Sequence, residues 1–145
     1  TPSPIVLSTL ESAELIVVCP SNPLVSVAPI LAVPGVRAAL GAAEAPKVAV
    51  SPIVGGSALR GPADRMLESL GYEVSPVGVA RLYKGLLDGF VMDGLDEALA
   101  SEVGSLGLEV LVTNTVMQDQ PDREALADEV LRWGRTLARG GKVVR

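Results

Sequence analysis

The chain has 145 residues, enough for one domain with a hydrophobic core, and 48% of them are hydrophobic while only 3% are aromatic. The net charge of −5 and the lack of any basic run argue against nucleic acid and anionic membrane as partners. With no histidine and a single cysteine, Cys19, the chain excludes Ser-His-Asp and Cys-His catalysis from its own residues, disfavours a zinc site and allows no internal disulfide.

Strand and helix patterns alternate along the chain. In order, they predict a helix at 4–13, a strand at 14–19, short helical pieces at 26–42 broken at Pro29 and Pro34, a strand at 47–51, helices at 62–71 and 75–83, a strand at 89–93, a helix at 95–107, a strand at 108–113, the longest helix at 121–137, and a weakly patterned tail at 138–145. The first helix starts at Ser3 and Pro4 and carries an apolar face that includes Ile5. The first strand, ELIVVC, is apolar throughout, so we expect it to be covered on both faces.

This alternation predicts the α/β class, with an open, mainly parallel, Rossmann-like sheet and helices on both faces. No internal repeat or linker divides residues 1–145. The first predicted strand has no preceding partner strand, so either the sheet is small or the chain is part of a larger domain.

No signal peptide is visible and no apolar run reaches about 18 residues, so we expect a cytoplasmic protein.

Ligands of open α/β sheets bind outside the carboxyl ends of the strands, and three loops there carry polar groups. The first, CPSNPLVS, offers Ser21, Asn22 and Ser26 beside a helix predicted to begin near Ser26. Such a loop could cradle an anion or a ribose. Equally, Ser26 could be a simple helix cap and Asn22 part of a turn. The residue types leave both interpretations open.

The second loop, SPIVGGSALRGPAD, favours contact with a phosphate or a nucleotide. Gly55 and Gly56 allow close approach of the backbone, Ser57 adds a hydroxyl, and Arg60 is a bidentate phosphate donor. The alternative is a strand-to-helix connection that needs two glycines for its turn. The loop matches neither the Walker A nor the GxGxxG pattern.

The third loop, VTNTVMQD, places Thr113, Asn114 and Thr115 after a strand, where they could hydrogen-bond a heterocycle or a ribose. Asp119 is predicted to cap the last helix.

Asp88 and Asp93 flank the third strand and could bind Mg²⁺, although a turn role is favoured for both. Other side chains are assigned structural roles: solvated helix faces for Arg65, Glu68, Arg132 and Arg135, and core or interface packing for Trp133.

At these loops the sequence resembles a known family. The segments PSNPLVSVAPILAVPGVRAAL, AVSPIVGGSALRGPADRM and VLVTNTVMQD are similar, in order, to segments of the 2-phospho-L-lactate transferase family, including its actinobacterial phosphoenolpyruvate-using members. The resemblance implies biosynthesis of coenzyme F-420. In that reaction the ribityl hydroxyl of the deazaflavin Fo attacks phosphorus in a GDP-linked 2-phospholactate or phosphoenolpyruvate donor, GMP is released, and Mg²⁺ stabilises charge.

The resemblance also implies site residues. Ser21, Asn22 and Ser26 would face the nucleotide or the substrate phosphate, and Ser51 with Val54, Gly55, Gly56 and Ser57 would form a second wall of the same cleft. Thr113, Asn114 and Thr115 are weaker candidates for that cleft. Cys19 stands where the family more often has glycine, which places close ligand approach at that point in doubt.

The family is considerably longer than this chain, which therefore resembles its C-terminal part. The glycine-rich first turn and the acidic residues associated with Mg²⁺ and Fo would belong to the N-terminal half. The resemblance thus implies that Mg²⁺ is bound mainly outside residues 1–145, and no metal site or catalytic residue is assigned within them. It also implies that the chain alone is inactive and that the protein is a homodimer.

Two other interpretations remain. One is a nucleotide-sugar-binding regulatory protein of the same superfamily, although the PSNP tetrapeptide counts against it. The other is a non-catalytic nucleotide-binding or dimerisation module. The sequence does not choose between phospholactate and phosphoenolpyruvate as the donor group.

Overall fold

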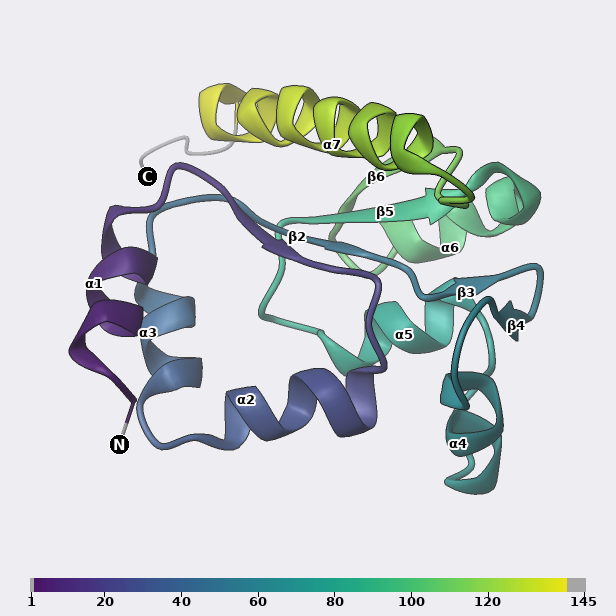
Figure 1. Ribbon diagram of the computed structural model, residues 1–145, viewed down its shortest axis with the longest axis horizontal. Coiled ribbons are helices and arrows are strands. Elements are labelled where there is room, and N and C mark those ends of the chain that lie inside the picture. Colours follow the sequence, from purple (N-terminus) through teal and green to yellow (C-terminus); the bar gives the residue numbers. More distant parts are fainter. Residues whose placement is uncertain (1, 141–145) are drawn as a thin grey trace.

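A computed structural model of the chain describes residues 2–140, with side chains up to residue 137 (Figure 1). Four strands form the main sheet: β1 (Ile16–Val18), β2 (Lys47–Val50), β5 (Gly89–Asp93) and β6 (Glu109–Thr113). Their order is β1-β2-β5-β6 and each neighbouring pair is parallel. All four strands lie where the sequence predicts them, and the α/β, mainly parallel architecture is confirmed.

The helices connect these strands in chain order. They are α1 (Pro4–Ser12), the π-helical turn η1 (Pro23–Val27) leading into α2 (Ala28–Ala32), α3 (Val36–Ala42), α4 (Ala63–Ser69), α5 (Pro76–Leu82), the 3-10 helix η2 (Gly94–Leu99) leading into α6 (Ala100–Gly104), and α7 (Gln120–Gly140). Of the predicted tail, residues 138–140 extend α7 and residues 141–145 lie outside the described part.

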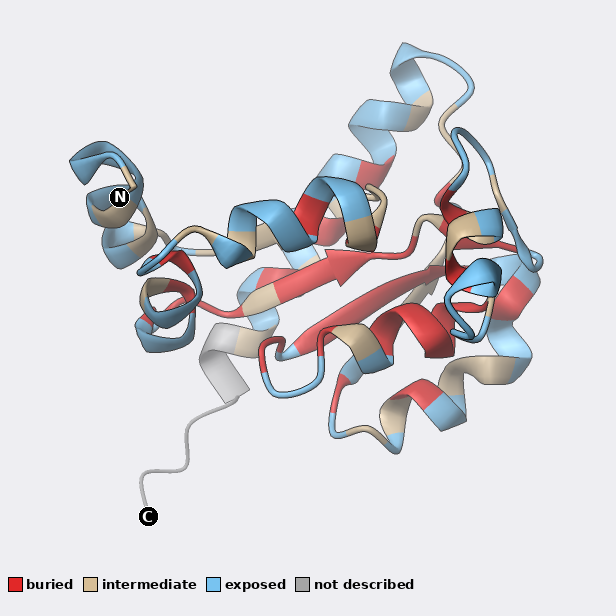
Figure 2. Cartoon of the chain, turned by 90° about the horizontal axis from the view of Figure 1, so that it is seen from below, coloured by how far each residue is buried: buried red, intermediate tan, exposed pale blue. Residues whose placement is uncertain are grey.

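Side chains alternate between the two faces of the sheet, and each face has its own core. On one face, Ala49, Phe90 and Met92 pack against residues of η1, α4, α5 and α6. On the other, Val48, Val50 and Val91 pack against Leu126 and Val130 of α7. Burial is concentrated on the central strands and α5, while the outer sides of the helices are exposed (Figure 2). The predicted placement of helices on both faces is therefore confirmed.

Trp133 belongs to the core beneath α7, as predicted. Its ring lies against Gly89 at the start of β5, where an added Cβ would come within 2.6 Å of the ring. Any larger residue at position 89 would therefore displace α7 from the sheet.

One expectation about the N-terminal elements is wrong, and a second feature was not anticipated. The first strand is not covered on both faces, because β1 is an edge strand and its three residues are only half-buried. The apolar face of α1 buries none of its residues, and Ile5 is 74% exposed. An apolar run shows that a segment can be buried, but it does not show how much neighbouring structure is present to bury it.

The predicted break at Pro29 is also wrong. Pro29 is the second residue of α2, directly after η1, and the helical backbone continues through it from Pro23 to Ala32. Pro34 does separate two helices: it is followed by Gly35, whose φ of 96° turns the chain into α3.

Two elements differ from their predicted form. The loop after β2 contains a small antiparallel hairpin, β3 (Ile53–Val54) with β4 (Ser57–Ala58), which was not predicted. The helix predicted at 95–107 begins as the 3-10 turn η2 and is α-helical only from Ala100 to Gly104. Neither difference changes the order of the strands.

Candidate functional site

A cleft opens at the carboxyl edge of the sheet, where the loops that follow β1, β2 and β6 come together. Its volume is about 170 Å³. It is lined by Pro20, Asn22, Ser51, Pro52, Leu59, Arg60, Ala63, Thr115, Met117 and Arg123. Four of these residues, Asn22, Ser51, Arg60 and Thr115, belong to the set predicted from the sequence. The three predicted loops thus contribute to one cleft.

The other eight predicted residues do not line this cleft. Ser21 is half-buried in the first loop, Ser26 is exposed on η1, Val54 is buried in β3, Gly55 and Gly56 form the exposed tip of the hairpin, Ser57 is exposed on β4, Thr113 is half-buried at the end of β6, and Asn114 is exposed after it. Their contact with a ligand stays a prediction.

Asn22 is the N-cap of the first helical segment after β1. Its side-chain oxygen accepts hydrogen bonds from the backbone N–H groups of Leu24 (2.9 Å) and Val25 (3.3 Å), and Pro23 follows as the first helical residue. The helix therefore begins at Pro23, and the prediction that it begins near Ser26 is wrong. The cap role that the sequence left open for Ser26 falls to Asn22, whose oxygen can accept these N–H groups directly.

The amide nitrogen of Asn22 is turned the other way, toward α4. It donates to the sulfur of Met66 at 3.4 Å, a weak acceptor. An oxygen acceptor on a ligand in the cleft would be a stronger partner for this N–H group. Asn22 thus combines a fixed position, set by its oxygen, with a donor that can be redirected.

The loop after β2 is held by short-range hydrogen bonds. The hydroxyl of Ser51 donates to the carbonyl of Ile53 (2.9 Å) and accepts from its N–H group (3.2 Å). Gly55 and Gly56 then turn the hairpin with φ values of 58° and 79°. These values favour glycine, so the alternative of a turn that needs two glycines is supported.

Asp96 anchors the hairpin tip. Its carboxylate is buried and accepts a hydrogen bond from the Gly55 N–H group at 3.0 Å. This contact ties the tip to η2 on the neighbouring connection. The backbone N–H group of Gly55 therefore already has a hydrogen-bond acceptor within the protein.

Arg60 follows this hairpin and lies at the mouth of the cleft. Its side chain has no hydrogen-bond or ion-pair partner among the described residues. Nearby Asp64 is an acceptor for backbone groups: its carboxylate accepts from the N–H groups of Arg65 (2.8 Å) and Ala58 (3.2 Å), and these bonds lower its pKa. Asp64 thus fixes the loop that carries Arg60 and leaves the guanidinium unpaired.

Arg123, in the first turn of α7, also lines the cleft. Asp119 caps this helix, as predicted, by accepting from the Asp122 N–H group at 3.0 Å. The Arg123 side chain has no partner among the described residues. Arg123 was not among the residues predicted from the sequence, although a signal was present. A cation in the first turn of a helix opposes the helix dipole, which indicates another role for it.

Thr115 is the only residue of the third loop's polar triplet that reaches the cleft. It is buried, and both its N–H group (2.8 Å) and its hydroxyl (3.2 Å) donate to one carboxylate oxygen of Asp93. The other oxygen of Asp93 accepts from the Leu95 N–H group at 3.0 Å. Asp93 therefore holds two connections in place, which confirms the turn role favoured for it.

Asp88 has a comparable role at the opposite edge of the sheet. Its carboxylate accepts from the Lys47 N–H group at 2.8 Å and lies 3.7 Å from the Lys47 ammonium group. It lies before β5, on the side away from the cleft. The turn role predicted for Asp88 is therefore wrong, because its carboxylate joins the start of β5 to the start of β2.

None of the residues that line the cleft is Asp or Glu, and the part of the chain that the structure describes holds no group of three metal-ligating side chains. Mg²⁺ requires several oxygen ligands, and the Asp93 oxygens already accept backbone and hydroxyl groups. What the cleft offers instead is two guanidinium groups, an amide and no opposing carboxylate.

Comparison with known protein families identifies the relationship. The family model for 2-phospho-L-lactate transferase CofD matches residues 1–130. The chain belongs to this family. It is 43% identical to a phosphoenolpyruvate transferase of Streptomyces griseus over 90% of the chain, 36% identical to a 2-phospho-L-lactate transferase of Methanocaldococcus jannaschii over 88%, and 38% identical to a phosphoenolpyruvate transferase of Kitasatospora aureofaciens over 96%.

The family resemblance drawn from the three loops is thereby confirmed. The matched segments cover 41%, 39% and 44% of these relatives, so the chain spans about two fifths of their length. The relatives are named as transferases.

No single helix of residues 2–140 is long and apolar enough to cross a bilayer. The segments Pro23–Ala32 and Val36–Ala42 reach that length and composition only as a pair, and they are bent by 88° at their junction.

Proposed function

We propose that this chain supplies the donor-binding wall of a transferase in coenzyme F-420 biosynthesis. The enzyme would move a 2-phospholactyl or phosphoenolpyruvyl group from its GDP-linked donor to the ribityl hydroxyl of Fo and release GMP. Family membership supports the class of reaction. The observation that carries the proposal for this chain is that Arg60 and Arg123, neither of which has a side-chain partner within the described part of the chain, line one cleft at the carboxyl edge of the sheet.

The charges of the cleft suit a diphosphate. A guanidinium group binds phosphate oxygens with two parallel N–H donors, which gives both attraction and orientation. The chain as a whole carries a net charge of −5, so an anion is attracted only where cations are gathered and carboxylates are kept away. The cleft meets both conditions, and the Asn22 amide adds a neutral donor.

The size of the cleft limits how much of the donor it takes. Sites for drug-sized ligands typically occupy about 300–1,000 Å³, and this cleft measures about 170 Å³. We therefore assign the diphosphate to it and place the guanine, the organic acid and Fo beyond its walls. The predicted contacts of Ser21, Ser26, Val54, Gly55, Gly56, Ser57, Thr113 and Asn114 with substrate belong to that outer region.

In the proposed reaction, the Fo hydroxyl oxygen forms a bond to the phosphorus that carries the organic acid. The bond from that phosphorus to the bridging oxygen breaks, GMP leaves with the bonding electron pair, and the hydroxyl proton is lost. Arg60 and Arg123 would hold the diphosphate in line and stabilise negative charge on the transferring and leaving groups. This role needs no histidine.

The remaining parts of the proposal concern the whole enzyme. Mg²⁺ would be bound mainly by carboxylates in the part of the family that this chain does not span, the enzyme would be a cytoplasmic homodimer, and the 145-residue chain alone would be inactive. Mg²⁺-dependent turnover by the 145-residue chain would contradict the last point.

The experiment supplies Fo, Mg²⁺ and each GDP-linked donor to the protein at full family length, and the products are identified by mass. We expect the phosphodiester of Fo and GMP in equal amounts with at least one donor. No product with either donor would contradict the proposed reaction. Tight binding of GDP without any binding of Fo would instead indicate a nucleotide-binding module.

A further inference from the structure

The polar side chains that line the cleft differ in the direction of the hydrogen bonds that they offer to a ligand. Arg60 and Arg123 can only donate, and the free end of the Asn22 side chain is its amide nitrogen, which is also a donor. A hydroxyl group can donate or accept. The hydrogen bonds that Thr115 makes inside the protein decide which of the two its hydroxyl offers.

The proton of the Thr115 hydroxyl is directed at Asp93. The hydroxyl oxygen lies 3.2 Å from a carboxylate oxygen of Asp93, and the same carboxylate oxygen accepts the Thr115 N–H group at 2.8 Å. An ionised carboxylate only accepts, so the hydroxyl is the donor. The Thr115 hydroxyl oxygen receives no hydrogen bond from the described residues. Thr115 therefore keeps its acceptor capacity for the cleft that it lines.

Asp93 is fixed in the position that holds this hydroxyl. Its other carboxylate oxygen accepts from the Leu95 N–H group at 3.0 Å, and its backbone lies in β5, paired with Thr113 of β6. Asp93 and Thr115 are only 5% and 3% exposed, so water does not compete for their contact. Hydrogen bonds in a chain polarise one another, and a hydroxyl that donates to a buried carboxylate becomes a stronger acceptor.

The other side-chain acceptors that line the cleft are largely occupied. The Asn22 oxygen accepts two backbone N–H groups. The Ser51 hydroxyl donates to the Ile53 carbonyl and accepts from the Ile53 N–H group, which leaves it one lone pair. Among the described side chains of the cleft, Thr115 thus provides the acceptor with the most remaining capacity.

A ligand must bring a hydrogen-bond donor to such an acceptor. The oxygens of a diphosphate are acceptors that suit the two arginines, and they offer nothing to Thr115. In the proposed reaction the donors nearest the diphosphate are alcohols. They are the ribose hydroxyls of GDP and the attacking hydroxyl, which must come within about 3–3.5 Å of phosphorus even though the rest of Fo lies outside the cleft. The N–H groups of guanine lie one ribose further away.

We infer that Thr115, oriented by Asp93, binds an alcohol group of the substrates by accepting its hydrogen bond. The inference rests on the proposed function, because it takes the diphosphate to be held by Arg60 and Arg123. Thr115 is then a substrate contact, and Asp93 is a positioning residue that acts through it. With donors for the phosphates and an acceptor for the alcohol, the cleft fixes the orientation of one group relative to the other.

Thr115→Val tests the contact, because it removes the hydroxyl and keeps both the β-branched shape and the backbone N–H group that Asp93 accepts. If the alcohol belongs to the ribose, the variant should bind GDP about 3–10-fold more weakly and bind 2′,3′-dideoxy-GDP as well as the unchanged chain does. Isothermal titration calorimetry gives both Kd values. Thr115→Ser keeps a hydroxyl and should restore most of the affinity.

Thr136→Val is the control. It makes the same change at an exposed position of α7 outside the cleft, where the hydroxyl donates to the Trp133 carbonyl. It should change neither Kd. Circular dichroism of all three variants verifies that the chain stays folded.

If the alcohol is the attacking hydroxyl, Thr115→Val in the protein at full family length should lower kcat by about 3–10-fold, and Thr115→Ser should restore it. The Kd for GDP and the KM for the donor should not change, because a misplaced hydroxyl slows the chemical step without weakening donor binding.

Unchanged values of both Kd and kcat in Thr115→Val would overturn the inference. Equal weakening of GDP and 2′,3′-dideoxy-GDP that Thr115→Ser does not restore would also overturn it, because Thr115 would then act through packing alone. Failure of the proposed function has a different signature, which is the lack of product from the unsubstituted protein. In that case the two nucleotides decide the inference: selective weakening of GDP supports it, and any other result overturns it.

Discussion

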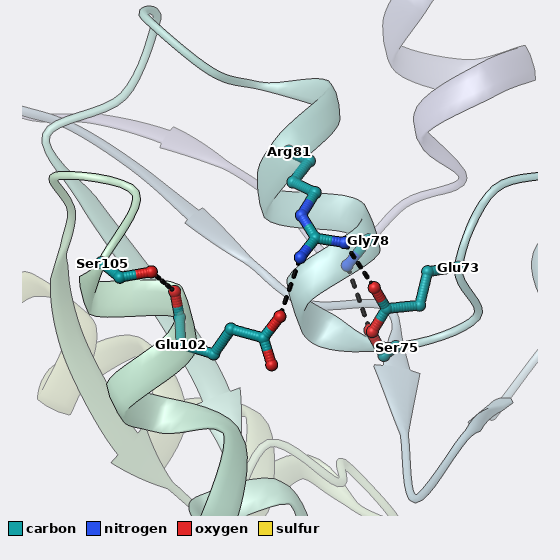
Figure 3. Close-up of polar contacts among 6 residues, drawn as sticks. All are labelled: Glu73, Ser75, Gly78, Arg81, Glu102 and Ser105. Atoms are coloured by element: carbon teal, nitrogen blue, oxygen red, sulfur yellow. Dashed lines mark hydrogen bonds and ion pairs between the residues drawn. The ribbon is translucent and has the colours of Figure 1, made fainter.

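Three arginines among the described residues, Arg60, Arg81 and Arg123, differ in their partners. Arg81 of α5 is paired twice: it donates to Glu73 just before α5 and, at 2.8 Å, to Glu102 of α6 (Figure 3). Glu73 also accepts from the Ser75 hydroxyl. Arg60 and Arg123 line the cleft and have no such partner among the described residues.

The contrast separates a cation that fastens two elements from cations that are available to a ligand. Carboxylates are abundant in this acidic chain, yet those near the cleft are engaged elsewhere: Asp64 and Asp93 accept backbone N–H groups. A guanidinium group that already donates to two carboxylates binds a further anion weakly, because its charge and its N–H donors are engaged. We therefore expect changes around Arg81 to alter stability, and changes in the cleft to alter ligand affinity.

The largest effect on stability should come from Gly78→Ala, in the first turn of α5 below Arg81. A Cβ at position 78 would lie 1.9 Å from the backbone oxygen of Glu73, which cannot move without loosening the Ser75 cap and the carboxylate that holds Arg81. We expect a loss of about 3 kcal/mol or more in the free energy of unfolding, measured by urea denaturation.

Gly104→Ala in α6 is the matched control. Its nearest neighbour is a methyl group of Val110 at 4.0 Å, so the added methyl has room. Stability should be unchanged or rise by up to about 1 kcal/mol. Equal losses for both variants would mean that the close approach at Gly78 is not what holds α5.

The sequence predicted the fold well where local signals and packing agree. Ser75 and Pro76 predicted the start of α5, and the Ser75 hydroxyl does accept from the Gly78 N–H group. The strands were predictable because apolar β-branched runs alternate with helices. The exposure of Ile5 and the open edge of β1 were not predictable, because burial depends on neighbouring segments that a local pattern does not contain.

The second prediction concerns Tyr83, which follows α5 and is buried beside the same core. Burial raises its pKa to about 12. The unfolded phenol ionises near pH 10 and the native one only near pH 12, so the unfolded state is favoured increasingly as the pH rises between these values. The free energy of unfolding should therefore fall by about 2 kcal/mol from pH 10 to pH 12.

Tyr83→Phe should remove this part of the pH dependence, because the ring remains and the titrating hydroxyl does not. Urea denaturation at pH 9, 10, 11 and 12, at constant ionic strength, gives the comparison. An unchanged slope in the variant would show that other groups cause the alkaline loss.

The candidate site was only partly predictable, for physical reasons that individual residues illustrate. Asn22, Ser51, Arg60 and Thr115 follow strands, and parallel strands bring their carboxyl ends to one edge. Gly55, Gly56 and Ser57 follow a strand too, but the hairpin carries them to its exposed tip. Arg123 was missed because it lies inside a helical pattern, where its charge looked like an ordinary solvated face.

The third prediction tests the cleft directly through Arg123→Gln. The substitution removes a charged donor from the cleft while the helix cap at Asp119 remains. Hydrogen bonds to charged groups contribute about 1.5–3 kcal/mol, so the affinity of the chain for GDP should fall about 10–100-fold. Isothermal titration calorimetry measures the Kd, and the free energy of unfolding should not change.

Arg135→Gln makes the same charge change on the exposed side of the same helix. It should leave the Kd within about twofold, because an exposed charge outside the cleft is screened by salt. If Arg123→Gln and Arg135→Gln weaken GDP equally, the effect comes from net charge, and the cleft has no special role.

The smallest effect should come from Arg81→Gln, even though Arg81 has the most partners. Its side chain is 48% exposed and its two carboxylate partners are 43% and 48% exposed, so water competes with both ion pairs. Exposed pairs of this kind contribute about 0–1 kcal/mol each. We expect a loss of about 1 kcal/mol in the free energy of unfolding that shrinks at high salt, with an unchanged Kd for GDP. A larger loss in affinity than in stability would place Arg81 with the ligand-binding arginines and remove the distinction between the two kinds.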